Sequence, residues 1–310
     1  MAVKLHFLLV PYDSGHREWR MGRGPAYLLR HGAGSAVRAL GHEVDAEYVE
    51  PGGFDSSNPP ASTEIATSFS LYREVAVRAR AARVAGALPV VLSGNCGATL
   101  GAVAAAATTT ETPNDVGVVW LDAHGDFNTP ETTASGFLDG MALAALTGRC
   151  WRTLAATIPG FAPVPDACVV LAGVRDVDPA EALLLEESEV NVIRADSMRR
   201  LGIRDALAPA LALLGERVTR VHLHVDADVL DAKVARANAF AVTGGVTIAE
   251  LQEIAGMVAS RFQIASLAFT AYDPAIDTES VVPGAIAGVL ESLLHVMPES
   301  APDARSAGAG

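Results

Sequence analysis

The chain has 310 residues, half of them hydrophobic, and a formal net charge of −13. This length suits one large α/β domain or two small ones, and the excess of acidic groups argues against a nucleic-acid partner. No apolar run reaches the roughly 18 residues of a membrane span, and three cysteines without a CxxC pair, Cys96, Cys150 and Cys168, are typical of the reducing cytoplasm.

Strand-like and helical runs alternate along the chain, which indicates a mostly parallel sheet with helices on both faces. Strands are predicted at Val3–Val10, Glu43–Val49, Pro89–Leu92, the apolar run beginning at Val116, Cys168–Gly173, Val190–Ile193, the apolar run beginning at Val221, and Ile264–Phe269. Helices are predicted at Pro25–Leu40, Glu64–Ala85, an Ala-rich stretch ending near Thr108, Leu138–Thr147, Arg204–Leu214, Thr247–Ala259 and Glu279–Val296. Polar or Gly- and Pro-rich stretches at 12–24, 52–63 and 131–137 are predicted loops. No linker separates two domains, so we expect one α/β domain over residues 1–297 and a disordered tail over residues 298–310.

The run that begins at Val116 ends in three polar residues spaced two apart, Asp122, His124 and Asp126. In extended backbone such residues point to the same side, so two carboxylates and an imidazole converge where the strand leaves the core. These groups repel and desolvate one another unless a cation compensates. For this triplet alone, a metal site and a turn after the strand are equally good interpretations.

A second strand end repeats the pattern, with His222, His224, Asp226 and Asp228 on one face. The two sets together offer enough oxygen and imidazole donors for one or two divalent ions and favour Mn²⁺ over Zn²⁺. The repetition makes a metal site the better interpretation. Cys96 follows another predicted strand and faces the same crevice if the sheet is parallel; it is equally well explained as a small buried hydrophobe.

Four blocks of the sequence resemble those of the ureohydrolase family, which comprises the arginases and agmatinases. The blocks are Ser93-Gly-Asn-Cys, Asp122-Ala-His-Gly-Asp, Arg175-Asp-Val-Asp and His224-Val-Asp-Ala-Asp. Their family counterparts, in the same order, are Gly-Gly-Asp-His, Asp-Ala-His-x-Asp, Arg-Asp-x-Asp and Ser-x-Asp-x-Asp. The resemblance implies a single-domain, three-layer α/β sandwich with a mostly parallel sheet of about eight strands, and hydrolysis of a C–N bond with two Mn²⁺ ions. Within the family, residues 122–133 together with Cys96 are most similar to the Nω-hydroxy-L-arginine amidinohydrolases of D-cycloserine biosynthesis.

The resemblance also implies which residues hold the two ions. The ligands of the second ion would be Asp122, His124, Asp226 and Asp228. The ligands of the first ion would be Asp122, Asp126, Asp226 and Cys96, which stands where most members have His. Because a thiolate is a softer donor than an imidazole, Zn²⁺ is an alternative to Mn²⁺ at the Cys96 site.

Further matches concern the amino-acid end of a substrate. In arginases an Asn and a Ser hold the α-carboxylate, and the corresponding residues are Asn128 and Ser135. The α-ammonium would lie near Asp178 and Glu181. The general preference for acidic residues at a helix N-terminus is an alternative explanation for these two residues. The resemblance therefore implies an α-amino acid substrate rather than a bare amine such as agmatine.

The residues expected around the reacting end of the substrate differ from the family pattern. Where arginases place a Glu that clamps the guanidinium, this chain has Ala271. Asp273, two residues on, lies on the same face if the strand continues and is the expected substitute. The proton-shuttle His of arginases corresponds to Asp139, which can act as an acid only if its pKa is raised.

The resulting hypothesis is a metal-dependent hydrolase that cleaves a C–N bond in the guanidino- or amidino-type side chain of an α-amino acid, Nω-hydroxyarginine or an arginine-like compound. A hydroxide bridging the two metals attacks the amidino carbon, Asp126 orients it and Asp139 protonates the leaving amine. Two alternatives remain, a single-zinc deacylase of histone-deacetylase-like type using Asp122, His124 and Asp226, and a non-catalytic amino-acid-binding relative. The cysteine pattern predicts a cytoplasmic protein, and the family resemblance implies a homo-oligomer, either a trimer or a hexamer.

Overall fold

The computed structural model describes residues 2–53, 63–107 and 115–297. Its centre is an eight-stranded sheet in which every pairing is parallel, with the strand order β4-β1-β5-β10-β9-β6-β7-β8. The strands are β1 (Lys4–Val10), β4 (Glu43–Tyr48), β5 (Leu88–Ser93), β6 (Val116–Leu121), β7 (Val169–Val174), β8 (Asn191–Arg194), β9 (Arg220–Asp226) and β10 (Gln263–Thr270). All eight strands predicted from the sequence are therefore confirmed, to within a few residues at their ends.

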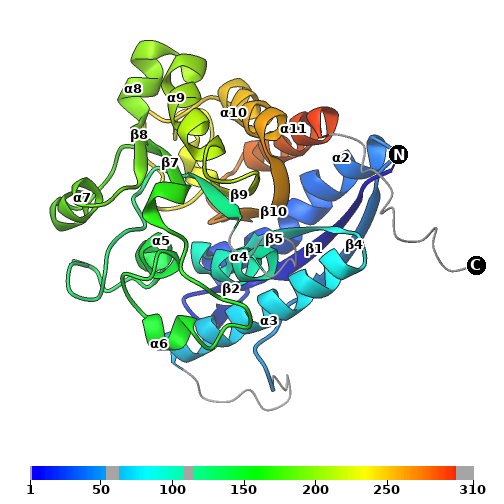
Figure 1. Cartoon of the computed structure of the whole chain (residues 1–310). Helices are drawn as coiled ribbons and strands as arrows, with labels where there is room; N and C mark the ends of the chain where they lie inside the picture. Colours follow the sequence, from blue (N-terminus) through cyan, green and yellow to red (C-terminus); the bar gives the residue numbers. More distant parts are fainter. Residues whose placement is uncertain (1, 54–62, 108–114, 298–310) are drawn as a thin grey trace, which may run out of the picture.

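Helices cover both faces of this sheet, which gives the three layers that the sequence predicts (Figure 1). One layer contains α1 (Gly24–Leu28), α2 (Gly34–Ala39), α8 (Ala195–Leu201), α9 (Ile203–Gly215), α10 (Ile248–Arg261) and α11 (Val281–Val296). The other contains α3 (Glu64–Val84), α4 (Thr99–Ala107), α5 (Ala142–Leu146) and α6 (Arg152–Ala155). Helix α7 (Pro179–Glu186) lies at the side, beyond β7 and β8 (Figure 1).

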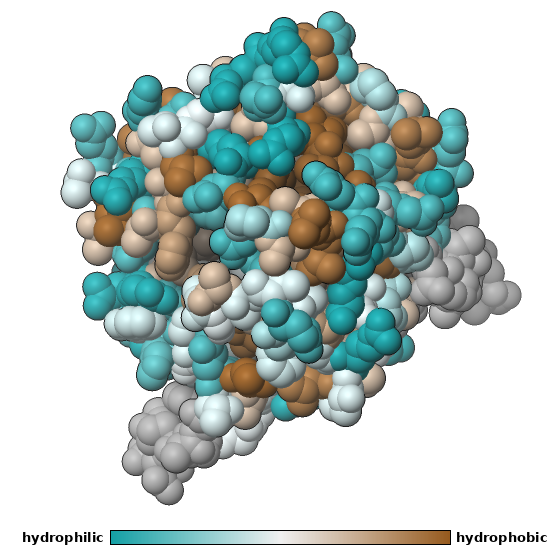
Figure 2. Space-filling model, turned by 90° about the vertical axis from the view of Figure 1, so that its left-hand side faces the viewer, coloured by the Kyte–Doolittle hydropathy of each residue, from teal (hydrophilic) through white to brown (hydrophobic). Residues whose placement is uncertain are grey.

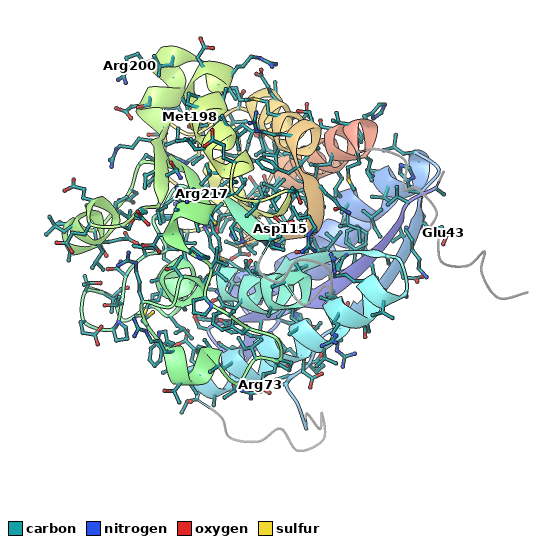
Figure 3. All side chains as sticks on the ribbon, in the orientation of Figure 1. Glu43, Arg73, Asp115, Met198, Arg200 and Arg217 are labelled. Carbon is teal, nitrogen blue, oxygen red and sulfur yellow. The ribbon has the colours of Figure 1, made fainter. Side chains whose placement is uncertain are left out.

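The two apolar layers follow from the alternation of side chains along buried strands. In β1, Leu5, Phe7 and Leu9 pack into the layer under α10 and α11, whereas Leu8 and Val10 pack into the layer under α3 and α4. The side chains fill the space on both sides of the sheet, from Glu43 in β4 to Arg200 in α8 (Figure 3). Burial of both faces explains the apolar runs of β5, β6 and β7, whereas the edge strand β4 is largely exposed and carries Glu43, Asp45 and Glu47.

Several boundaries differ from the sequence-based prediction. The predicted helix Pro25–Leu40 is divided into α1 and α2 by a π-helical turn at Leu29–Ala33, where Gly32 packs directly on the backbone of Pro283. The predicted helix Leu138–Thr147 is reduced to a 3₁₀ turn and α5. A short hairpin, β2 (Tyr12–Asp13) and β3 (His16–Arg17), occupies part of the predicted polar loop. The predicted tail at 298–310, most of the 52–63 loop and the predicted helix end at Thr108 lie outside the described residues.

The strand order determines where the functional side chains meet. β5, β10, β9 and β6 are consecutive in the sheet, and Thr270 at the end of β10 is in register with both Ser93 and Asp226. The segments that carry Cys96, Asp226 and Asp122 therefore leave the sheet side by side at its carboxyl edge. In the part of the chain that the structure describes, no helix has the length and apolar character needed to cross a membrane.

Candidate functional site

A cavity of about 310 Å³ opens at the carboxyl ends of the central strands. Seven carboxylate side chains line it, those of Asp126, Asp139, Asp176, Asp178, Glu181, Asp226 and Asp228, and none of the described lining residues is Lys or Arg. The face that carries α7 shows hydrophobic groups scattered among hydrophilic ones (Figure 2). A cavity with this charge favours cations, either metal ions or a positively charged substrate.

Two groups of potential metal ligands lie at this edge of the sheet. The first consists of Cys96, Asp122, His224 and Asp226, and the second of Asp122, His124 and Asp228. Within each group the donor atoms lie within 4.8 Å of one another. Asp122 belongs to both groups, so the structure offers adjoining sites for two ions that share one carboxylate.

Burial and mutual repulsion act strongly on these carboxyl groups. Burial raises the pKa of Asp226 well above its usual range, and the neighbouring carboxylates of Asp228 and Asp122 add to the effect. Burial, with Asp122 and Asp139, raises the pKa of Asp126 in the same way. The Oδ2 atom of Asp126 is buried and has no hydrogen-bond partner among the described residues. A buried carboxylate oxygen without a partner, among other carboxylates, is the environment that a divalent cation would satisfy.

His124 is held between carboxylates of the second group. Its Nδ1 lies 3.3 Å from Asp122 Oδ1 and 3.4 Å from Asp228 Oδ2. Burial opposes its protonation, but Asp228 and Asp122 together raise the pKa of His124 to about 10. The carboxylates of Asp122 and Asp228 therefore favour the protonated form of this imidazole, and a divalent ion at this position would replace that interaction.

Asp122 is fixed by donors on both sides of its carboxylate. Trp120 Nε1 donates to Asp122 Oδ2 at 3.0 Å, and the backbone N–H of His124 donates to Asp122 Oδ1 at 2.8 Å. The indole of Trp120 also stacks on His224, with ring centroids 3.6 Å apart. Trp120 therefore orients a carboxylate and an imidazole together.

We expect the substitution Trp120→Phe to lower metal affinity by about tenfold, because it removes the hydrogen bond to Asp122 and keeps the aromatic ring. Calorimetric titration of the metal-free protein with Mn²⁺ measures the change. Trp151→Phe is the matched control, since the indole of Trp151 donates to Met141 Sδ and does not line the cavity. Equal effects of the two substitutions would contradict this role for Trp120.

Asp139 lies in the cavity wall next to the Cys96 segment. Its carboxylate accepts hydrogen bonds from Asn95 Nδ2 at 2.8 Å and from the backbone N–H of Gly97 at 3.2 Å. Burial raises the pKa of Asp139 to about 7, although these hydrogen bonds act in the opposite direction. A carboxyl group of that pKa can donate a proton near neutral pH.

The residues expected at the amino-acid end also line the cavity: Asn128, Ser135, Asp178 and Glu181. Asn128 Nδ2 donates to Asp178 Oδ2 at 3.0 Å. Both Glu181 oxygens already accept backbone hydrogen bonds, from Phe127 and from Asp178. Glu181 therefore serves the loop and the start of α7 as part of a capping box, and Asp178 keeps the greater capacity to accept from a ligand.

The expected role of Asp273 as a substitute clamp is not supported by its position. β10 ends at Thr270, and Ala271 has a left-handed backbone conformation with φ 59°. The strand therefore does not continue, and Asp273 is not on the face of Ala271. Ala271 lines the cavity, whereas Asp273 does not, and Asp273 Oδ1 accepts the backbone N–H of Ala275 at 2.9 Å.

Several site residues were not identified from the sequence. Asn238 Nδ2 donates to Asp228 Oδ2 at 3.1 Å and to the backbone oxygen of Ala271 at 2.8 Å. Asn238 therefore links Asp228, an expected metal ligand, to Ala271, which stands where arginases have the clamping Glu. Phe137 and Phe240 stack at the cavity wall with ring centroids 5.4 Å apart. Asn238 and Phe240 lie in the long segment after β9, which shows no periodicity or motif that would have indicated them.

A model described as the arginase family matches residues 3–295. The chain belongs to the arginase family. The arginase of Bacillus caldovelox is 34% identical over 209 residues, which cover 67% of this chain and 69% of that protein. The arginase of Brevibacillus brevis is 28% identical and covers 94% of this chain and 98% of its own length.

Solved structures support the same assignment. The native arginase structure from Bacillus caldovelox superposes with a TM-score of 0.83 at 27% identity and covers 94% of this chain and 98% of its own. The formimidoylglutamase of Bacillus subtilis shares the fold, with a TM-score of 0.73 at 18% identity and coverage of 96% and 89%. Arginase-family proteins are enzymes that hydrolyse amidino C–N bonds at a binuclear metal centre, and this chain carries ligand groups for such a centre. It is a metal-dependent hydrolase acting on a small molecule.

Proposed function

We propose that this enzyme hydrolyses a C–N bond in the guanidino- or amidino-type side chain of an α-amino acid, and that Nω-hydroxyarginine is its substrate. The observation that carries the proposal is the pair of ligand groups joined by Asp122 at a cavity lined by carboxylates. In the reaction, water adds to the amidino carbon, the C–N bond to the δ-nitrogen breaks, and that nitrogen gains a proton. The products are hydroxyurea and ornithine.

Two divalent ions, which we propose to be Mn²⁺ with Zn²⁺ as an alternative at the Cys96 site, would polarise the substrate and lower the pKa of a water molecule. Asp122 and Asp226 would be shared by both ions. Cys96 and Asp126 would complete the set for the first ion, and His124 and Asp228 that for the second. The unpartnered oxygen of Asp126 supports its place at this centre.

The chain's own residues would position the reactants and move the proton. Asp126 would orient the attacking water through the carboxylate oxygen that does not bind the ion. Asp139 would protonate the leaving amine, which its pKa near 7 and its hydrogen bond from Asn95 support. At the other end, Asn128 and Ser135 would hold the α-carboxylate and Asp178 the α-ammonium, with Glu181 positioning Asp178.

Ala271 is the reason to prefer hydroxyarginine over arginine. A methyl group cannot form a charge-assisted hydrogen bond with a buried guanidinium, and an unpaired buried cation costs several kcal/mol. N-Hydroxylation makes a guanidine less basic, so the loss of the carboxylate clamp affects hydroxyarginine less. Asp273 is not among the described residues that line the cavity, so its position does not support it as a substitute for the clamp.

A single-zinc deacylase using Asp122, His124 and Asp226 is the weaker alternative. The two adjoining ligand groups favour two ions over one. A non-catalytic binding protein is also disfavoured, because the ligand groups and the acidic cavity are both present. We further propose a cytoplasmic homo-oligomer, a trimer or hexamer, formed by the domain at residues 1–297.

The test combines metal content with a substrate panel. Protein purified without chelator is analysed for metals, reconstituted with Mn²⁺ or Zn²⁺, and assayed with hydroxyarginine, arginine, agmatine, formimidoylglutamate and an acetyl-lysine peptide. We expect two ions per chain and ornithine release that is fastest with hydroxyarginine. One Zn²⁺ per chain with deacylation, or no turnover with any metal and substrate, would overturn the proposal.

The substitution Ala271→Glu tests the substrate assignment directly. It restores a carboxylate at the clamp position, so we expect kcat/KM for arginine to rise at least about tenfold relative to that for hydroxyarginine. Ala271→Gln has a similar volume without the charge and serves as the control. If both variants keep the wild-type ratio of the two substrates, residue 271 does not contact the reacting end.

A further inference from the structure

His224 has a buried imidazole side chain and no role in the proposed mechanism. It lies near the end of β9, two residues before Asp226, and its exposed fraction is 0%. The sequence block in which it occurs has Ser at this position in the family pattern, and Cys96 stands where the family pattern has His. The chain has thus lost an imidazole from one segment of the site and gained one in another.

The position of His224 brings its imidazole to the first ligand group. One of its ring nitrogens lies within 4.8 Å of donor atoms of Cys96, Asp122 and Asp226. Thr270 Oγ1 lies 3.2 Å from His224 Nε2 and 3.2 Å from Cys96 Sγ, so the same hydroxyl joins the two donors. Cys96 Sγ lies 3.0 Å from Asp226 Oδ2.

The orientation of the ring is fixed on its other side. Thr99 Oγ1 lies 2.8 Å from His224 Nδ1, and the Trp120 indole stacks on the ring with planes 13° apart. A histidine that binds a metal ordinarily donates its other N–H to a protein oxygen, which fixes the tautomer. Donation from Nδ1–H to Thr99 leaves the Nε2 lone pair on the side of the ring that faces Thr270, whose hydroxyl also contacts Cys96.

We propose that His224 is a ligand of the first metal ion, which is then held by Cys96, Asp122, His224 and Asp226. The inference deepens the proposed binuclear hydrolase and rests on it. One thiolate, one imidazole and two carboxylates form a four-donor set suited to Zn²⁺, Co²⁺ or Fe²⁺ rather than Mn²⁺. The second group, Asp122, His124 and Asp228, contains only oxygen and imidazole donors and keeps the preference for Mn²⁺. His224 thereby takes the place in the ligand set of the first ion that is proposed above for Asp126, and Asp126 keeps its role of orienting water.

Titration of the metal-free protein with Co²⁺ tests this ligand set. Co²⁺ bound by a thiolate gives a charge-transfer band in the near ultraviolet, and four-coordinate Co²⁺ gives visible bands several-fold stronger than those of six-coordinate Co²⁺. The variants are His224→Asn, which shortens the side chain, and Thr99→Val, which removes the hydroxyl at Nδ1 and keeps the shape. His222→Asn is the matched control, because His222 is equally buried on the same strand and belongs to neither ligand group.

We expect the wild type and His222→Asn to show both the charge-transfer band and strong visible bands with one equivalent of Co²⁺. His224→Asn should lose the strong visible bands and bind the first ion at least about 100-fold more weakly, and Thr99→Val should bind it about tenfold more weakly. Circular dichroism and melting of the metal-free variants establish that each is folded.

Unchanged Co²⁺ spectra and affinity in folded His224→Asn would overturn the inference, and so would an equal loss in His222→Asn. These readouts are independent of turnover. If the spectra behave as expected but no amidino substrate is hydrolysed, the ligand assignment stands and the proposed function fails.

Discussion

Replacing Asp122 with Asn is expected to lower kcat/KM by at least about three orders of magnitude and to remove both metal ions. Asp122 is the residue that the two ligand groups share, and it is 1% exposed. The substitution removes a negative charge from both ions and places an amide where Trp120 Nε1–H and the His124 N–H now donate. Loss of a charged ligand at a buried ion is among the largest effects available to a single substitution.

Elemental analysis after gel filtration and steady-state kinetics measure this loss. Asp205→Asn, at an exposed position in the first turn of α9, is the control and should keep full metal content and activity. Retention of two ions by folded Asp122→Asn would be incompatible with a carboxylate shared between the sites.

Removal of metal is expected to lower the melting temperature by about 5 °C or more when the holoprotein is measured at metal concentrations of at least 100 times Kd. The structure also predicts how this difference depends on pH. In the metal-free chain, burial raises the pKa of both Asp126 and Asp226 well above the usual range. Their folded pKa values therefore exceed the unfolded value of about 3.9.

The direction of the pH effect follows from linkage. The contribution of these two groups to the stability of the metal-free protein is full below the unfolded pKa and is lost as pH rises through the raised folded pKa. Metal binding requires deprotonated ligands, so metal affinity rises over the same range. The difference in melting temperature between metal-bound and metal-free protein should therefore increase from about pH 5 to pH 8. A difference that is constant or decreases would show that these carboxyl groups do not meet at a metal site.

The sequence by itself determined the layered architecture. The strands β5, β6 and β7 are buried on both faces, so each of these three appears as an apolar run. Alternating Asp and His at the ends of β6 and β9 indicated a metal site because side chains two apart in extended backbone share a face. The family resemblance was carried by those same blocks, and the match to residues 3–295 confirms it.

Only the tertiary structure decided how contacts between distant segments complete the site. The sequence offered both His222 and His224 as donors, and the position of β9 between β10 and β6 places only His224 with Cys96 and Asp122. Asn238 reaches Asp228 from a segment without a motif. Asp273 does not line the cavity, because the backbone turns away from the strand direction at Ala271. Ala271 has a left-handed backbone conformation, which a non-glycine residue rarely adopts and which the sequence does not indicate. Local patterns determine which face of a strand a residue occupies, whereas the partner across the sheet depends on strand order and on where each strand ends.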